Sequence, residues 1–283
     1  MAMENKDWTY IITSKRRWFD IDLKEYWKYR NLYRMYIRRD MIAAYKQTIL
    51  GPIWYILQPL FTMVIYIFIF GNIAKIPTDG VPQPLFYFSG IILWNFFLSS
   101  FSYSSEIFIN NQQIFSKIYF PRLITTLSAI TTNFIKLAIQ LVLFIIMYIG
   151  FVLAHYPISP NWTLALFPLL VILLAGFSLS WGLVLSSVTY KYRDLKQVTN
   201  FGIQLFMYVT PVVYPLGATS EKFKLIIELN PLTSIFEAFR YSFTGYGDFS
   251  TWGLIYSCIC VVISMILGLL CFNRTQWNYI DTV

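Results

Sequence analysis

Charged residues are scarce in this chain of 283 residues: Asp, Glu, Lys and Arg make up 13%, whereas 57% of the residues are apolar. Soluble domains contain about 25% charged residues. A soluble fold is excluded, because a chain of this length has too little interior to hide so much apolar surface. A disordered chain is excluded for the same reason. The mean hydropathy of +0.55 indicates a polytopic helical membrane protein.

Residues that commonly carry catalysis are also few. The sequence has one histidine, His155, and three cysteines, which all lie in the apolar run Trp252–Phe272. It contains no HExxH motif, Cys/His cluster, G-x-S-x-G elbow or P-loop. We therefore expect no covalent chemistry, metal or cofactor on this chain, and we expect any ATP and Mg to be held by a partner protein.

Long runs without charge predict six transmembrane helices, since about 20 apolar residues are needed to cross a bilayer. The fold class is therefore all-α polytopic membrane protein, with 1–283 as a single transmembrane domain. Spans one to five fall within 49–214 and span six within 252–272. The six runs are Ile49–Phe70, Pro84–Ser105, Leu123–Ala154, Leu164–Val188, Val198–Tyr214 and Trp252–Phe272.

Between spans five and six, the segment Leu216–Asp248 is apolar in patches but carries seven charged residues. One helix crossing lipid with that charge would be very costly. The pair Asn230-Pro231 divides the segment into two halves of similar length. We expect two short re-entrant helices over 216–248. A helical hairpin on the outer surface is the alternative.

Basic residues predict the orientation. Most of the 22 Lys and Arg residues lie in residues 1–48, in the loops after spans two and four, and in the tail 273–283. Loops rich in Lys and Arg stay in the cytoplasm. Both termini are therefore expected to be cytoplasmic, which requires an even number of crossings.

Two cytoplasmic segments have amphipathic patterns. Asp22–Lys46 places aromatic and basic residues at helical spacing, which favours an interface helix among lipid headgroups; an ordinary packed helix is the alternative. The loop 110–122 is short, aromatic and ended by proline. It suits docking into a groove of a partner protein, and a loop packed on its own bundle is the alternative. Lys136, the charge inside span three, either lines a polar path or lies near the interface, and the second interpretation is slightly favoured.

Six pieces of sequence, in one order, resemble the membrane (permease) subunit of ABC type-2 exporters, the class that exports O-antigen, capsular polysaccharide or teichoic acid. The resemblance covers nearly the whole chain. One departure is Leu123, where many relatives carry an acidic residue. The six pieces are TILGPIWYILQP, FYFSGIILWNFF, FSKIYFPR, YKYRDLKQV, TPVVYP and LNPLTSIFEAFR.

The resemblance implies ATP-driven export of a lipid-linked, O-antigen-like polysaccharide across the bacterial cytoplasmic (inner) membrane. The chain would be a transport subunit and not an enzyme. Its partners would be a second copy of itself, two ABC ATP-binding subunits, undecaprenyl-linked polysaccharide and membrane lipids, with no nucleic acid. One alternative is a same-fold exporter of teichoic acid, a drug or a small lipid. Another is an outer-face membrane transferase, which would need His155 or an acid among Glu228, Glu237 and Asp248.

The resemblance also implies roles for particular residues. Those expected to couple the chain to the ATPase are Ile114, Phe115, Lys117, Tyr119, Phe120, Pro121, Arg122, Tyr190, Arg193 and Asp194. Those expected at the substrate entrance are Tyr36, Arg38, Tyr45, Lys46 and Gly51. Those expected to form an outer gate are Pro211, Pro215, Asn230, Pro231, Glu237 and Arg240.

Aromatic residues make up 19% of the chain. The apolar C–H faces of sugar rings stack on aromatic side chains, so an aromatic duct would let a sugar chain slide. The alternative is that Tyr and Trp populate the membrane interfaces and that Phe faces lipid. The candidates for channel lining, taken from spans one, two and five, are Tyr66, Tyr87, Trp94, Tyr208 and Tyr214.

Overall fold

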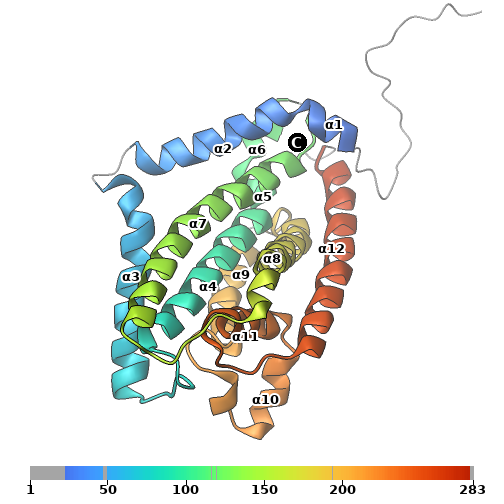
Figure 1. Cartoon of the computed structure of the whole chain (residues 1–283). Helices are drawn as coiled ribbons and strands as arrows, with labels where there is room; N and C mark the ends of the chain where they lie inside the picture. The colour runs from blue at the N-terminus through green and yellow to red at the C-terminus, as the bar shows by residue number, and fades with distance from the viewer. Residues whose placement is uncertain (1–22, 47–49, 116, 119, 193, 281–283) are drawn as a thin grey trace, which may run out of the picture.

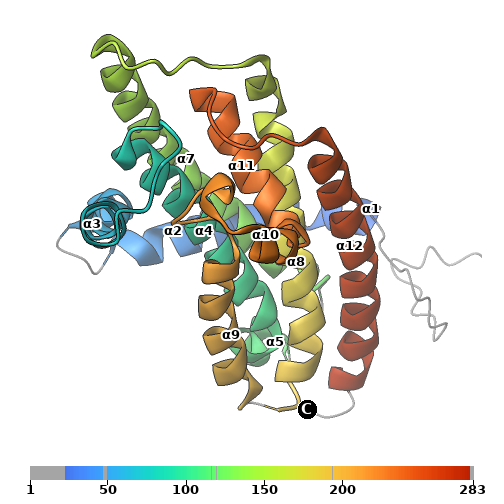
Figure 2. The same ribbon diagram turned by 90° about the horizontal axis from the view of Figure 1, so that it is seen from below.

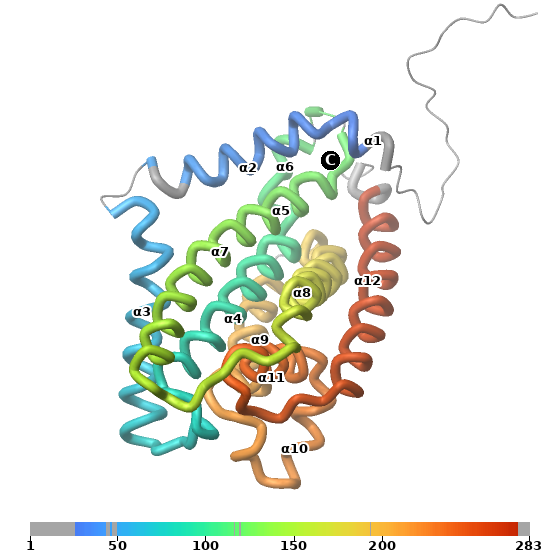
Figure 3. Tube along the Cα trace, in the orientation of Figure 1, coloured from blue at the N-terminus to red at the C-terminus, as the bar shows by residue number. Residues whose placement is uncertain are grey.

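The computed structural model describes residues 23–46, 50–115, 117–118, 120–192 and 194–280, and regular structure in these residues is helical throughout. α1 (Leu23–Lys28) and α2 (Arg30–Tyr45) run across the top of the molecule, and α10 (Glu221–Glu228) lies at the bottom (Figure 1). The C-terminal part of α12 (Thr251–Ile280) also lies near the top (Figures 1 and 3). We call the two sides the α2 end and the α10 end.

Within the described residues, five helices are long and apolar enough to cross a membrane. They correspond to predicted spans one to four and six, because uncharged runs of this length satisfy their backbone groups only as helices in lipid. They are Gly51–Ile73, which comprises η1 (Gly51–Ile53), α3 (Trp54–Tyr66) and the π-helical η2 (Ile67–Ile73), then α4 (Gln83–Ser105), α7 (Leu123–Leu153), η3 with α8 (Trp162–Leu166 and Phe167–Thr189), and α12 (Thr251–Ile280).

The fifth predicted span is shorter than the sequence suggested. α9 covers Leu195–Val209, which is 15 residues, or about 22 Å of helix. A hydrocarbon core is about 30 Å thick. The helix ends here because Thr210 adopts extended backbone before Pro211, as residues before proline usually do. The described part of the chain therefore shows five full-length spans and a short α9, not six full-length spans.

Several short helices complete the fold. α5 (Ile107–Asn110) and α6 (Gln112–Phe115) follow α4 at the α2 end. η4 (Leu216–Ala218), α10 and α11 (Pro231–Thr244) follow α9 at the α10 end. The predicted break at Asn230-Pro231 is confirmed, since α11 begins at that proline. Whether α10 and α11 re-enter a membrane stays a prediction.

α8 is packed between α4 and α12, whereas α3 stands apart at the other side of the bundle (Figure 2). Glycines permit this packing. A Cβ atom added at Gly182 would lie 2.3 Å from the Ser104 Cβ of α4, and one added at Gly268 would lie 2.6 Å from the Ser180 carbonyl oxygen of α8. Small residues let membrane helices approach to backbone contact. α4, α8 and α12 therefore form one closely packed unit.

We expect Gly182→Ala to lower the melting temperature of the detergent-purified protein. The added methyl group overpacks the α4–α8 contact, which typically costs about 1–3 kcal/mol. Gly150→Ala in α7 is the matched control, because no atom lies within 4 Å of its added Cβ. If both variants melted together with the wild type, the α4–α8 backbone contact would be wrong.

Candidate functional site

A buried ion pair organises the α10 end. Arg240 Nη1 lies 3.1 Å from Glu237 Oε1, and the side chains are only 3% and 2% exposed. Arg240 Nη2 donates to the Val212 carbonyl oxygen at 2.8 Å. Its guanidinium lies 4.0 Å from the ring centroid of Phe86, within the range of a cation–π interaction. One side chain thus joins α11, the turn after α9, and α4.

The chain is shaped locally to accept this arginine. A Cβ atom added at Gly90 in α4 would lie 2.5 Å from the Val212 carbonyl oxygen and 3.0 Å from Arg240 Nη2. A larger residue at position 90 would push the turn and the guanidinium away from α4. A buried charge is tolerated when it is both paired and hydrogen-bonded, whereas a buried charge without a partner strongly destabilises the fold.

Asn230 makes a second connection to the same turn. Its Oδ1 accepts a hydrogen bond from the Leu232 backbone N–H at 3.0 Å, and its Nδ2 donates to Thr210 Oγ1 at 2.9 Å. Asn as N-cap and proline at the first helical position are a favourable helix start. Pro211 and Pro215 are buried in the turn itself. The structure therefore brings the six predicted gate residues into one region, although their role as a gate is untested.

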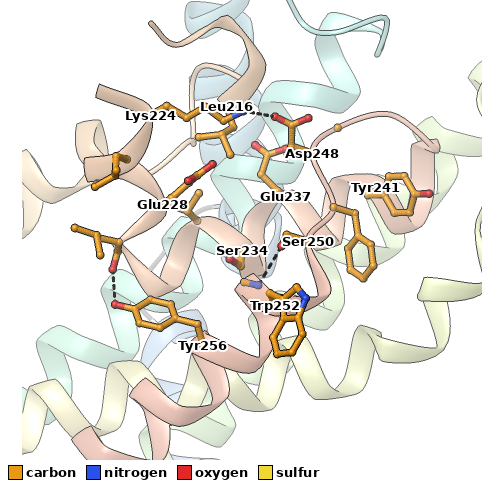
Figure 4. Close-up of a pocket in the computed structure, with 16 residues that line it drawn as sticks. Leu216, Lys224, Glu228, Ser234, Glu237, Tyr241, Asp248, Ser250, Trp252 and Tyr256 are labelled. Carbon is orange, nitrogen blue, oxygen red and sulfur yellow. Dashed lines mark hydrogen bonds and ion pairs between the residues drawn. The ribbon is translucent and has the colours of Figure 1, made fainter. Parts of the chain in front are cut away.

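A cavity of about 610 Å³ opens beside this region, between α10, α11 and the start of α12 (Figure 4). The carboxylates of Glu228, Glu237 and Asp248 line it, together with Trp252 and Tyr256. Two of the acids are engaged: Glu237 pairs with Arg240, and Asp248 Oδ2 lies 3.4 Å from Lys224 Nζ.

His155 is not among the residues that line this cavity. It is exposed, with a left-handed φ of 61°, just after α7. The cavity thus brings Glu228, Glu237 and Asp248 together but does not include this histidine. Asp79 lies in the loop between η2 and α4. Partial burial raises its pKa, and the negative charge of the Asp248 carboxylate raises that pKa further. The folded chain therefore favours the protonated form of Asp79 more than an unfolded chain would.

At the α2 end, a cluster of buried aromatic side chains joins five helices. Phe108 stacks on Phe272 with ring centroids 5.2 Å apart, and Phe115 meets Phe120 at 5.7 Å. Tyr36 of α2 packs against Phe120 at 6.3 Å. We call these five side chains the aromatic cluster. Together with Leu123, the first residue of α7, the aromatic cluster ties α2, α5, α6, α7 and α12 together.

Arg122 packs against the aromatic cluster. Its guanidinium lies 5.3 Å from the Phe115 ring centroid, and its Nη1 donates to the Gln276 carbonyl oxygen of α12 at 3.1 Å. Arg122, like Phe115 and Phe120, is buried within the chain's own bundle. For these three side chains, the structure therefore shows the second alternative for the loop 110–122, in which it packs on its own bundle.

Other predicted coupling residues lie at the surface. Lys117 and Asp194 are exposed, Ile114, Pro121 and Tyr190 are half-buried, and Tyr119 and Arg193 lie outside the described residues. Sequence analysis missed Ile118, an apolar side chain that is 62% exposed beside Lys117. The signal available in the sequence was an isoleucine directly after Lys117, within the loop 110–122 that was expected to lie at the cytoplasmic surface. The segment after α6 thus presents Lys117 and Ile118 outward and Phe115 inward.

The predicted entrance residues follow the path from α2 to η1. Arg38 and Lys46 are exposed. Tyr36 instead lies in the aromatic cluster, with the Arg39 guanidinium 4.5 Å from its ring centroid. Tyr45 ends α2, and the structure does not describe its side chain. Gly51 has a left-handed φ of 51° where η1 begins, a conformation that favours glycine.

Three of the five candidate lining residues gather where α3 meets α9. Tyr66 O–H donates to the Met207 sulfur at 3.7 Å, and Tyr214 O–H donates to the Tyr208 carbonyl oxygen at 2.9 Å. Tyr208 is exposed, whereas Tyr66 and Tyr214 are half-buried.

The other two candidates form a layer behind them. Tyr87 and Trp94 are both buried. The ring centroids of Tyr87 and Tyr66 are 6.4 Å apart, and those of Trp94 and Phe206 of α9 are also 6.4 Å apart. Of the five candidate lining residues, therefore, only Tyr66, Tyr208 and Tyr214 reach the surface of this chain. We call these three side chains the tyrosine surface.

A bundle of long apolar helices, crossed by α2 at one end and closed by short helices at the other, is the architecture of a polytopic helical membrane protein. The sequence model of the ABC-2 type transporter family matches residues 31–244. The chain belongs to this family.

Relatives with assigned names extend the comparison. The chain is 30% identical to an O-antigen export system permease protein of Klebsiella pneumoniae, over 86% of this chain and 91% of the relative. It is 25% identical to the protein of the same name in Myxococcus xanthus, over 78% and 83%. It is 22% identical to a polysialic acid transport protein of Escherichia coli, over 84% and 91%.

We expect Arg240→Met to destabilise the protein strongly, because it leaves the buried Glu237 carboxylate unpaired. Breaking a buried pair costs about 3–5 kcal/mol. Lys224→Met, which removes the exposed partner of Asp248, should cost about 0–1 kcal/mol. The comparison requires melting temperatures of both variants in one detergent. Similar melting temperatures for the two would refute the central role of Arg240.

Proposed function

We propose that this chain is the membrane subunit of an ATP-driven exporter that moves a lipid-linked, O-antigen-like polysaccharide across the bacterial inner membrane. The observation that carries the proposal is the similarity, over 78–86% of the chain, to relatives named for O-antigen export or polysialic acid transport. The chain carries out no covalent chemistry in this proposal. A separate ABC subunit binds ATP and Mg.

The α2 end faces the cytoplasm in this proposal. This end contains the basic α2, the loop after α6 and the loop between α8 and α9, whose flanking residues Thr189 and Lys196 contact the end of α4. Basic segments stay in the cytoplasm. Both chain ends then lie on the cytoplasmic side. With five full spans, α9 and the turn and helices after it together make the remaining crossing.

The ATP-binding subunit docks on the exposed residues after α6 and on the loop around Asp194. Phe115 and Arg122 then transmit its movement, since they are packed inside the aromatic cluster with α7 and α12. Close-packed interiors move as rigid bodies and do not deform continuously. Closure of the ATPase pair therefore shifts the long helices together.

The polysaccharide passes between two copies of the chain. The tyrosine surface supplies aromatic side chains at the proposed seam, and the region around Asn230, Glu237 and Arg240 forms the outer gate. The lipid carrier enters near Arg38, Tyr45, Lys46 and Gly51, where α2 turns into η1. These assignments follow the family resemblance, and Arg38, Lys46 and Tyr208 are exposed.

A second candidate, export of a small lipid by the same fold, is favoured by one observation. A strongly apolar groove of about 590 Å³ runs between α4, α8 and α9, lined by Phe97, Phe177 and Phe206 among others. A lipid chain fits such a groove. The names of the relatives favour the polymer, so we place the small lipid second.

Loss of the chain should leave the polymer on the wrong side of the membrane. In a strain lacking it, we expect surface polysaccharide to disappear and lipid-linked polymer to accumulate inside the cell. Re-expression of the wild-type chain should reverse both changes, which distinguishes export from a defect in synthesis. Normal surface polysaccharide in the deletion strain would overturn the proposed function.

A single exposed residue tests the docking surface. We expect Ile118→Glu to abolish co-purification of the ATP-binding subunit, because it places a charge at an apolar contact. Phe223→Glu is the control, since Phe223 is 61% exposed on α10 and Ile118 is 62% exposed near the α2 end. Retention of the ATPase by Ile118→Glu, or its equal loss from both variants, would contradict the assignment.

A further inference from the structure

Lys136 is a charge without an evident counter-charge inside a membrane span. Among the described residues of the five spans, it is the one charged side chain away from the helix ends; Arg274 lies close to the end of its span. Charged residues inside spans are costly and usually have a functional partner. Neither coupling, gating nor the tyrosine surface uses this lysine.

The surroundings of Lys136 are polar but lack an available acid. Its Nζ donates to Asn133 Oδ1 at 3.3 Å and lies 5.3 Å from the ring centroid of Tyr55 in α3. No carboxylate among the described residues lies within 4 Å of this nitrogen. The Asp40 carboxylate has an electrostatic effect on it, but Asp40 is bound by Arg39 at 2.8 Å.

The position of Lys136 corresponds to lipid headgroups. Five residues earlier in α7, Thr131 hydrogen-bonds to Tyr33 of α2, so Lys136 lies about 7.5 Å further along the helix axis. Tyr55 lies in the first turn of α3, and Gln140 Nε2 donates to its carbonyl oxygen at 3.1 Å. The lysine therefore occupies a corner bounded by α2, α3 and α7 just inside the α2 end, within reach of the polar layer of a bilayer.

We propose that Lys136 binds the phosphate of a lipid that enters the corner between α2, α3 and α7. An ammonium group donates charge-assisted hydrogen bonds to phosphate oxygens, and the amide of Asn133 and the ring of Tyr55 hold it in place. The phosphate supplies the missing negative charge. Either a polyprenyl diphosphate or an anionic phospholipid carries this chemistry, and the site does not depend on which polymer is exported.

Binding to the purified full chain in a neutral detergent tests the site. The probes are polyprenyl diphosphate without sugar, the matching polyprenol without phosphate, and phosphatidylglycerol. We expect Lys136→Met to bind at least one of the two phosphate lipids roughly tenfold or more weakly than the wild type. Lys136→Arg should keep this binding, and polyprenol should bind the wild type and Lys136→Met equally. Lys222→Met, on exposed α10, is the control for general loss of positive charge.

The two phosphate lipids distinguish the source of the phosphate. Lys136-dependent binding of polyprenyl diphosphate alone identifies a carrier-lipid site, and equal dependence for phosphatidylglycerol identifies a site for membrane phospholipid. In the absence of lipid, Lys136→Met should melt at or above the temperature of the wild type, because it removes an uncompensated charge. Undiminished binding of both phosphate lipids by Lys136→Met, or a large fall in its melting temperature, would overturn the proposal.

Discussion

The α10 end depends on one buried ion pair. Arg240 holds Glu237 on its own helix, the Val212 carbonyl in the turn after α9, and the Phe86 ring on α4. Asn230 also joins α11 to the turn after α9, but Arg240 extends this connection to α4. That connection matters because α9 is too short to be positioned by a bilayer alone. Through Arg240, both α11 and the turn after α9 are held against α4. Any opening of the chain at this end must either move these three segments together or break the pair.

The α2 end is held differently, by stacked aromatic rings and one buried arginine. Arg122 and the aromatic cluster connect α2 and α6 to α7 and α12, while Gly182 and Gly268 bring α8 into backbone contact with α4 and α12. In the proposed function, these contacts convert a movement at the surface after α6 into a movement of the long helices. The two ends are therefore linked through packed helices, and α3, which stands apart, is the helix least constrained by this core (Figure 2).

The sequence predicted the helical class and five spans closely, because uncharged runs bounded by charged loops leave few alternatives in lipid. It also predicted the break at Asn230, where an N-cap residue precedes proline. It placed the end of the fifth span at Tyr214, whereas α9 ends at Val209, and it left open whether Phe115 and Phe120 contact a partner or pack on their own bundle. Spacing alone cannot tell whether an aromatic loop packs on a partner or on its own bundle. The Arg240 contacts were equally hidden, since Gly90 and Val212 are distant in sequence.

The central claim is that this chain carries lipid-linked polymer out of the cytoplasm when its partner hydrolyses ATP. The most direct measurement uses inside-out membrane vesicles containing the chain and its ATP-binding subunit, with lipid-linked polysaccharide added in the outer solution. After ATP is supplied, the fraction of polymer protected from an added glycosidase is measured. The account predicts protection that requires both the chain and hydrolysable ATP. No protection with ATP, or the same protection in vesicles that lack the chain, would contradict it.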